Sequence, residues 1–229
     1  MRYFPNSSKI EEIKKKEKKV YQTIKENISA QIVEKKSKFI VDMFYITNVE
    51  EAEKKIEEIK KRYYDAKHHC YAYIVRNPKG KVEKCSDDGE PSGTAGVPIL
   101  HILSKKNLAN VLVVVTRYFG GILLGTGGLV RAYSEATKLA LEKAQYIQEE
   151  SGYLLQLDIS YEEYKNFNYY CNKNGINCIN ITYDDKIRAT IEVNEEEKTY
   201  ILENTRKLEF KILDYRILEQ KNIRKNIDK

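Results

Sequence analysis

The residues best suited to chemistry gather between Ser86 and Ser134, a stretch that holds eight of the eleven glycines in the chain. Glycine is favoured where the backbone takes a positive φ angle or must approach a ligand closely. An acidic segment, Asp87-Asp-Gly-Glu90, precedes an apolar run, and two arginines flank the glycine-rich loop that follows it. This arrangement predicts a shaped surface for a ligand or a partner.

The glycine-rich loop, residues 120–128, lies where an apolar strand gives way to a helix. It is neither nucleotide motif, because no lysine follows as in a phosphate loop and Val130 stands where a dinucleotide fingerprint needs glycine. Free backbone N–H groups at a helix that begins near Gly128 favour an anion. In the alternative interpretation, the glycines permit tight packing and the arginines pair with the acidic segment. The predicted anion- or RNA-binding residues are Arg117, Tyr118, Gly120, Gly121, Gly125, Gly127, Gly128 and Arg131.

The acidic segment offers a second set of candidates. Its carboxylates could bind a hard cation or transfer protons, although acids in turns more commonly cap helices or pair with arginine. His68 and His69 adjoin a strand, where neighbouring side chains point to opposite faces, so only one of them can face a given site. A packed or exposed histidine is the alternative to an acid/base pair of His68 with Asp88. The candidate catalytic residues are His68, Asp87, Asp88 and Glu90, and we predict no metal and no cofactor.

Composition sets broad limits on function. The chain has 229 residues, with 40 basic and 34 acidic side chains and a net charge of +6, which permits a nucleic-acid partner without requiring one. Phe119, next to Tyr118, offers a stacking surface for bases, with core packing as the alternative. The four cysteines form no metal-binding spacing, and neither a secretory signal nor a membrane span is evident. These features predict a soluble cytoplasmic protein with reduced thiols.

Apolar periodicity divides the chain into a charged extension (1–19), a first domain (20–150) and a second domain (151–229). A capping box opens the extension at Ser8. In the first domain we expect strands within 21–45, near 70–75 and 81–85, and a doubly covered strand at 110–116. Helices are expected after a capping box at Thr47–Glu50, at 97–104 and at 129–144. The second domain reads β-α-β-β-α-β, with helix caps at Ser160 and Asn194 and a last strand at 209–218, which is the ferredoxin-like order.

These residues resemble the signature of the IMPACT family, in the bacterial branch often called YigZ or YvyE. The resemblance covers about residues 21–140, and the βαββαβ part is similar to the C-terminal domain of that branch. Lys67 departs from the pattern, where threonine is more usual, which weakens any role built around His68. The matching residues are Lys36-Ser-Lys-Phe-Ile40, Ala66, His68, Tyr71-Ala-Tyr73, Asp87-Asp-Gly-Glu-Pro-Ser-Gly-Thr-Ala-Gly96, Ile99-Leu100, Leu103, Leu108, Val114-Val115, Arg117-Tyr-Phe-Gly-Gly121, Leu124-Gly125 and Gly127-Gly-Leu-Val-Arg-Ala-Tyr133.

The resemblance implies an α+β fold of two domains. The first would be ribosomal protein S5 domain 2-like, and the second ferredoxin-like and similar to domains of elongation factor G. Eukaryotic relatives are translational regulators that compete for a co-activator of an amino-acid-starvation kinase, using a further domain that finds no match here, so that partner is not expected. We therefore expect a non-enzymatic, monomeric, translation-associated regulator that binds RNA, the ribosome or a translation factor. The alternatives are an enzyme acting on a phosphorylated or carboxylated small molecule at the same cleft, and a protein-interaction module.

Overall fold

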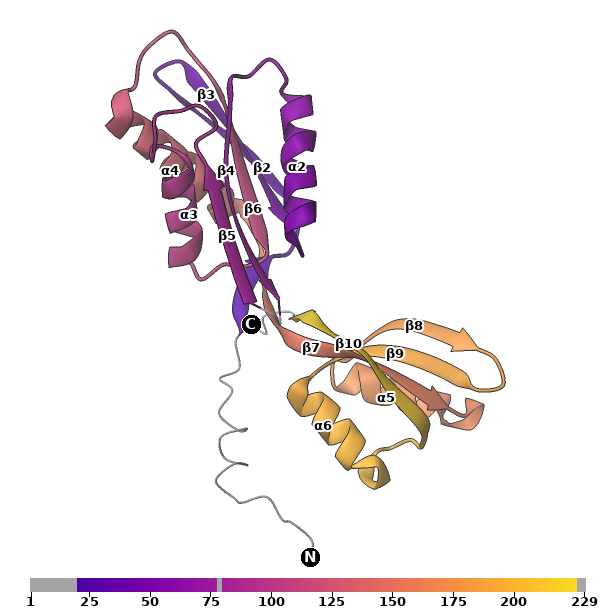
Figure 1. The fold of residues 1–229 in the computed structure, drawn as a ribbon. Coiled ribbons are helices and arrows are strands. Elements are labelled where there is room, and N and C mark those ends of the chain that lie inside the picture. The colour runs from indigo at the N-terminus through magenta and orange to yellow at the C-terminus, as the bar shows by residue number, and fades with distance from the viewer. Residues whose placement is uncertain (1–19, 78–79, 226–229) are drawn as a thin grey trace, which may run out of the picture. The chain divides into compact units, whose positions relative to one another are not determined.

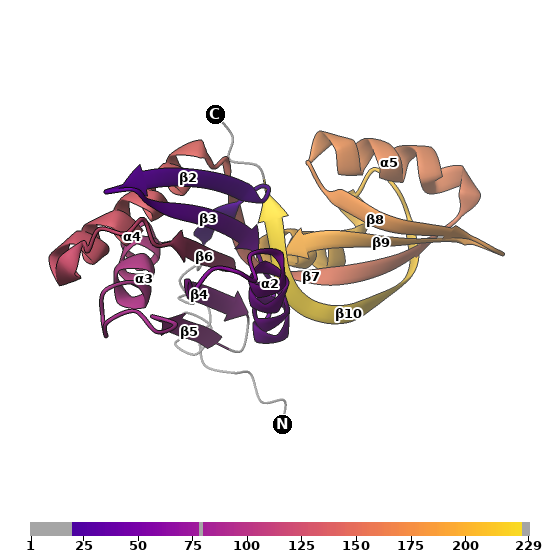
Figure 2. The same ribbon diagram turned by 90° about the horizontal axis from the view of Figure 1, so that it is seen from above.

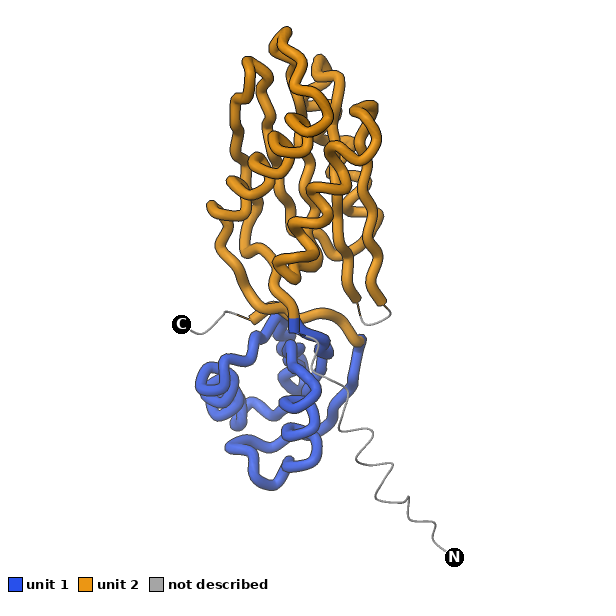
Figure 3. Tube along the Cα trace, turned by 90° about the vertical axis from the view of Figure 1, so that its left-hand side faces the viewer, with its two compact units in different colours: residues 1–20, 150–219 blue, residues 21–149, 220–229 orange. Residues whose placement is uncertain are grey.

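The computed structural model describes residues 20–77 and 80–225, which form two compact units (Figure 3). Unit 2 comprises Tyr21–Glu149 together with residues 220–225, and unit 1 comprises Val20 and Glu150–Glu219. The last strand of the chain therefore begins in unit 1 and ends among the residues of unit 2. The capping box predicted at Ser8 and part of the turn after Asn77 lie outside the described residues.

Unit 2 is built on a five-stranded sheet in the order β2-β3-β6-β4-β5. The strands are β2 (Ile28–Glu34), β3 (Ser37–Tyr45), β4 (His68–Asn77), β5 (Gly80–Ser86) and β6 (Val111–Tyr118). Strand β6 is central, and its residues from Val111 to Arg117 are all buried. A strand that is apolar on both faces must be covered on both, so the central, doubly covered strand predicted at 110–116 is confirmed.

Helices lie on both faces of this sheet (Figures 1 and 2). A separate hydrophobic core fills each face. Helix α2 (Val49–Arg62) packs on one face through Ala52, Ile56 and Ile59. Helices α3 (Gly96–Lys105) and α4 (Gly125–Lys143) cover the other face. A short strand, β1 (Tyr21–Ile24), pairs with the first residues of β7.

Unit 1 follows the order β7 (Tyr146–Ile159), α5 (Tyr164–Lys173), β8 (Asn177–Tyr183), β9 (Ile187–Asn194), α6 (Glu195–Glu203) and β10 (Ile212–Lys225). Its strands pair in the order β10-β7-β9-β8, and α5 and α6 share one core with one face of the sheet. This is the ferredoxin-like arrangement. The fold class is confirmed: both domains are α+β, the first S5 domain 2-like and the second ferredoxin-like.

Several predicted helix boundaries are wrong by a turn or less. The N-cap of α2 is Asn48, whose Oδ1 accepts the Glu51 N–H at 2.8 Å, so the predicted box at Thr47–Glu50 is one residue early. Helix α4 begins at Gly125, not near Gly128, because its glycines form the first turn. The capping box of Asn194 with Glu197 is confirmed.

Two predicted boundaries in unit 1 also move. The side chain of Ser160 caps nothing, because a short 3-10 turn, Tyr161–Glu163, precedes α5. Strand β10 starts three residues later and continues well past the predicted 209–218. Its first predicted residues instead follow a second 3-10 turn, Thr205–Lys207, and lead into the sheet with Phe210 buried.

Candidate functional site

The strand register of unit 2 places Phe39, Arg117 and His68 side by side at one end of the sheet. Arg117 on β6 lies opposite Phe39 of β3 on one side and opposite His68 of β4 on the other. Directly opposed residues of antiparallel strands share a face. All three side chains therefore lie on the face covered by α3 and α4, beside the acidic turn Asp87–Glu90.

Arg117 forms a buried ion pair with Glu90. The guanidinium Nη1 lies 2.7 Å from Glu90 Oε1, and the two side chains are only 7% and 3% exposed. The same carboxylate oxygen accepts a hydrogen bond from the Tyr133 hydroxyl at 2.9 Å, and burial raises the pKa of Tyr133, with Cys70 and Glu90 adding to the effect. Removing one partner of such a pair leaves a charge buried without compensation. Glu90 and Arg117 thus hold this end of the fold together.

Arg117 also supports an exposed aromatic ring. Its guanidinium carbon lies 5.5 Å from the ring centroid of Phe39 and 5.6 Å from that of Phe119. Phe39 is fully buried, whereas Phe119 is 54% exposed. One side of the Phe119 ring therefore contacts a fixed guanidinium, and the remainder is open to solvent.

Asp87 organises the acidic turn from within. Its carboxylate accepts backbone N–H groups of Gly93, Ala95 and Gly96 at 2.8, 2.9 and 2.8 Å. Burial acts to raise the pKa of Asp87, but these three hydrogen bonds prevail and lower it below its usual 3.8. The carboxylate is thereby committed to the turn and to the start of α3.

Asp88 and His68 do not form the acid/base pair proposed from the sequence. The Asp88 carboxylate accepts the backbone N–H of His69 at 2.7 Å, and His68 Nδ1 instead faces the Asp88 carbonyl oxygen at 2.9 Å. Because a carbonyl oxygen only accepts, Nδ1 carries the proton in this hydrogen bond. His69 lies on the other face, where its Nε2 is 3.1 Å from the carbonyl oxygen of Tyr63. The two histidines thus point to opposite faces, as predicted.

The glycine-rich loop packs tightly at its start and opens afterwards. A Cβ atom at Gly120 would clash with the Lys36 carbonyl, and the Gly120 N–H donates to Ser37 Oγ at 3.2 Å. Gly121 and Gly125 have φ angles of +84° and +68°, a region that glycine adopts most easily. The loop therefore packs against the β2–β3 turn at Gly120. From Gly121 to Gly125, where it leads into α4, its glycines have open space around them.

The N-terminus of α4 differs from those of α2 and α6. It has no side-chain cap and no acidic residue in its first turn, whereas the other two carry an asparagine cap and glutamates. Arg131 Nη1 instead lies 3.8 Å from where a Cβ of Gly127 would be. A cation at the positive end of the helix dipole is electrostatically unfavourable. An anion bound there would offset the positive charge of Arg131 and that of the helix N-terminus.

Exposed cations lie around the loop. Lys36, Lys38 and Arg131 are exposed, and none forms an ion pair within residues 20–77 and 80–225. The Tyr118 hydroxyl is already engaged, donating to Asp65 at 2.7 Å, and this hydrogen bond raises the pKa of Tyr118 to about 12. We define the glycine-loop surface as residues 119–128 with Lys36 and Arg131.

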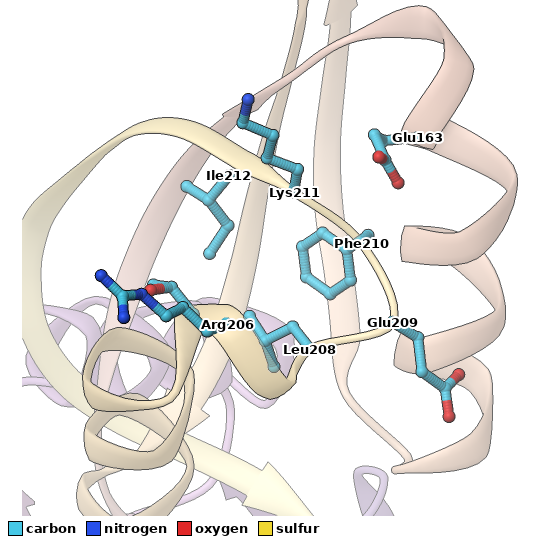
Figure 4. Close-up of a pocket in the computed structure, with 8 residues that line it drawn as sticks. Glu163, Arg206, Leu208, Glu209, Phe210, Lys211 and Ile212 are labelled. Atoms are coloured by element: carbon cyan, nitrogen blue, oxygen red, sulfur yellow. The ribbon is translucent and has the colours of Figure 1, made fainter.

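In the part of the chain that the structure describes, no three His, Cys, Asp or Glu side chains gather as they would around a metal ion. An open pocket of about 460 Å³ lies in unit 1, with Leu208, Phe210 and Ile212 beside charged side chains (Figure 4). It contains none of the residues predicted as a site. No helix of the described residues is long and apolar enough to cross a membrane.

Comparison with known proteins identifies the family. Residues 35–141 match the family model described as the Impact N-terminal domain. IMPACT family member YvyE of Bacillus subtilis is 34% identical in an alignment of 204 residues that covers 79% of this chain and 93% of that protein. This chain belongs to the IMPACT family.

Two further relatives of this IMPACT chain are informative. IMPACT family member YigZ of Escherichia coli is 44% identical over 110 residues, 48% of this chain and 54% of that protein. A crystal structure described as that of a hypothetical protein is 29% identical and covers 82% of this chain and 91% of its own, with a TM-score of 0.59. The relationship therefore extends over both units.

Some residues that build the site were not among the predicted ones. Ser37, Phe39 and Tyr133 are buried and support Arg117, Gly120 or Glu90. Ser37 and Phe39 stand in the family-like run at 36–40, and Tyr133 closes the family-like run after the loop. The resemblance pointed to these positions, but their roles depend on contacts between distant parts of the chain.

Proposed function

We propose that this IMPACT chain is a translation-associated regulatory protein that binds RNA, on its own or within a ribosomal partner, through the glycine-loop surface. The observation that carries the proposal is the Phe119 ring, half exposed and fixed against the guanidinium of Arg117. Family membership supports the link to translation, since the resemblance implies that eukaryotic relatives are translational regulators.

The geometry favours binding over catalysis at this end of unit 2. A general acid or base must have a proton-accepting or proton-donating atom available to a substrate. Asp87 is committed to three backbone N–H groups, Glu90 to Arg117 and Tyr133, and the Asp88 carboxylate to the His69 amide. The carboxylates of these acids are used in hydrogen bonds that stabilise the fold. This supports binding, and not catalysis, as the function of the neighbouring loop.

RNA suits the chemistry of this surface. Aromatic rings stack on unpaired bases with little sequence preference, and a ring held rigid loses little entropy on binding. Lys36 and Arg131 supply positive charge for phosphates, and the uncapped N-terminus of α4 offers N–H groups to the same anions. Single-stranded segments should therefore bind better than duplexes, whose bases are already stacked.

The experiment is fluorescence anisotropy with a labelled single-stranded RNA and a matched duplex, over a range of salt concentrations. We expect binding to the single strand, weakening as salt rises because phosphate contacts release counterions. Phe119→Ala should weaken binding by about 1–3 kcal/mol, the range for loss of one base–aromatic stack. Phe119→Tyr should retain binding, since it keeps the ring.

Charge reversal provides a matched control. Arg131→Glu should weaken binding and flatten the salt dependence, whereas Lys54→Glu, which reverses an exposed cation on α2 over the other face of the sheet, should change little. If the Phe119 and Arg131 variants bind RNA as tightly as the unmodified protein, this surface is not the RNA-binding site.

A further inference from the structure

Strand β10 lies at an edge of the unit 1 sheet. Among the residues that the structure describes, it pairs with β7 alone, which leaves its other side unpaired there. Every residue from Leu213 to Glu219 is exposed, including Leu213, Tyr215 and Ile217 at 52%, 48% and 48%. The Tyr215 N–H donates to Asp214 Oδ1 of its own strand at 2.8 Å. A long edge strand with exposed apolar side chains is a template for pairing with another strand.

The sequence of this edge is self-complementary. Residues 212–218 read Ile-Leu-Asp-Tyr-Arg-Ile-Leu, with an acid and a base placed symmetrically about Tyr215. If two copies pair antiparallel about Tyr215, Asp214 of each lies opposite Arg216 of the other, and Leu213 lies opposite Ile217. Neither Asp214 nor Arg216 forms an ion pair within residues 20–77 and 80–225. Opposite charges and apolar side chains placed directly across two strands both stabilise their pairing.

Two other sheet edges lack this property. Strand β8, at the far edge of the same sheet, has a register irregularity between Cys178 and Asn180, and such bulges hinder further pairing. Strand β5, an edge of the unit 2 sheet, has exposed Lys81 and Lys84, and edge lysines also discourage pairing. Strand β10 has a long exposed edge, and the sequence of that edge is complementary to a second copy of itself.

We infer that a second copy of this chain is the partner of β10, and that two copies join their unit 1 sheets through an antiparallel β10–β10 contact with Tyr215 on the two-fold axis. Such an isologous contact closes on itself and limits the assembly to a dimer. The paired segment is short, and small interfaces are weak, so the dimer should form reversibly as concentration rises. This departs from the monomer expected from the sequence and does not depend on the proposed RNA surface.

Sedimentation velocity of the full chain tests the contact, from micromolar to millimolar concentration. The unmodified protein should shift from monomer to dimer. Asp214→Arg alone, or Arg216→Asp alone, places like charges opposite each other and should weaken association by about tenfold or more, equivalent to about 1.4 kcal/mol. The double variant Asp214→Arg/Arg216→Asp restores opposite charges and should recover the dimer. The control Glu135→Lys/Lys138→Glu exchanges an exposed pair on α4 and should have no effect.

A cysteine substitution tests the register. Tyr215→Cys places two thiols opposite each other at Cα separations that a disulfide can span, so oxidation with diamide, which removes one hydrogen from each thiol, should yield a covalent dimer. Leu213→Cys lies opposite position 217 of the other copy and should not cross-link to itself. Circular dichroism of each variant separates loss of pairing from loss of folding.

Each result bears on the inference directly. A concentration-dependent dimer that the single charge reversals weaken, that the double exchange recovers and that Tyr215→Cys locks supports it. A protein that stays monomeric throughout, a dimer indifferent to both charges, or cross-linking through Leu213→Cys in place of Tyr215→Cys overturns it.

Discussion

The acidic turn and the glycine-rich loop stand at the same end of unit 2, yet their functional groups have opposite surroundings. In the turn, the carboxylates of Asp87, Asp88 and Glu90 are all hydrogen-bonded within the fold. On the glycine-loop surface, Phe119, Leu123 and Arg131 face solvent, with Leu123 83% exposed. Both regions carry residue types that often act in binding or catalysis, and they differ in whether those side chains have partners within the fold. Side chains that are hydrogen-bonded within the fold stabilise it, whereas exposed side chains are available to bind a ligand.

The largest effect we expect comes from the buried pair of the turn. Glu90→Ala leaves the Arg117 guanidinium buried without its carboxylate and should cost about 3–5 kcal/mol in the free energy of unfolding, measured with urea. Glu135→Ala, which breaks the exposed pair with Lys138, should cost no more than about 1 kcal/mol. Equal losses for the two variants would mean that the buried pair of Glu90 with Arg117 does not stabilise this end of unit 2.

Two glycines of the loop should respond in opposite directions. Gly120→Ala drives a methyl group into the Lys36 backbone and should destabilise by about 1–3 kcal/mol or more. Gly127→Ala meets nothing closer than 3.8 Å within α4 and should stabilise by up to about 1 kcal/mol, because alanine favours helix more than glycine does. Thermal unfolding of both variants checks the sign. Stabilisation by Gly120→Ala would contradict the close approach to Lys36.

Asp87 should give a smaller effect that depends on pH. Asp87→Ala leaves three backbone N–H groups without their acceptor and should cost about 1–3 kcal/mol at pH 7. Because the folded pKa lies below 3.8, this contribution is fully present above pH 3.8 and disappears as pH falls through the folded value. The stability difference between the two proteins should therefore narrow in acid. A difference that stays constant, or widens, would contradict the assignment.

The surface residues should affect stability least. Phe119→Ala and Arg131→Glu should each change the free energy of unfolding by no more than about 0.5–1 kcal/mol, since neither side chain completes a core. Urea unfolding of both variants beside Lys54→Glu measures this. A loss of unfolding free energy as large as that from Glu90→Ala would show that these side chains stabilise the fold and are not a surface available to a partner.

Local patterns predicted most of the helices and strands, whereas the fold of the first domain was implied by the family resemblance. The apolar run Val111–Val115, four valines and one leucine, predicted a buried strand. Asn194 with Glu197 formed the predicted capping box because both hydrogen bonds are made within four residues. The misplaced cap at Thr47 shows the limit of such reasoning, since Asn48 one position later competes for the same role and wins. The choice between these two neighbouring caps decided where the helix begins.

The candidate site was less predictable for a physical reason. The sequence left Arg117 with three acids as alternative partners, and the choice of Glu90 depends on how the turn before α3 folds against β6. The support that Arg117 gives to Phe119 likewise requires Phe39 of a strand far away in the chain. Residue types pointed to the right end of the molecule, but long-range contacts decided which groups remained exposed.

The most direct test of the central claim is sedimentation of cell lysate through a ribosome-separating gradient at low and moderate salt. It compares the unmodified protein with Phe119→Ala/Arg131→Glu and with Lys54→Glu, all shown to be folded. We predict that the unmodified protein and Lys54→Glu travel with ribosomal particles at low salt, while the double variant stays at the top. If the double variant travels with the particles as the unmodified protein does, or if no form ever leaves the top, the glycine-loop surface is not a contact with the translation machinery.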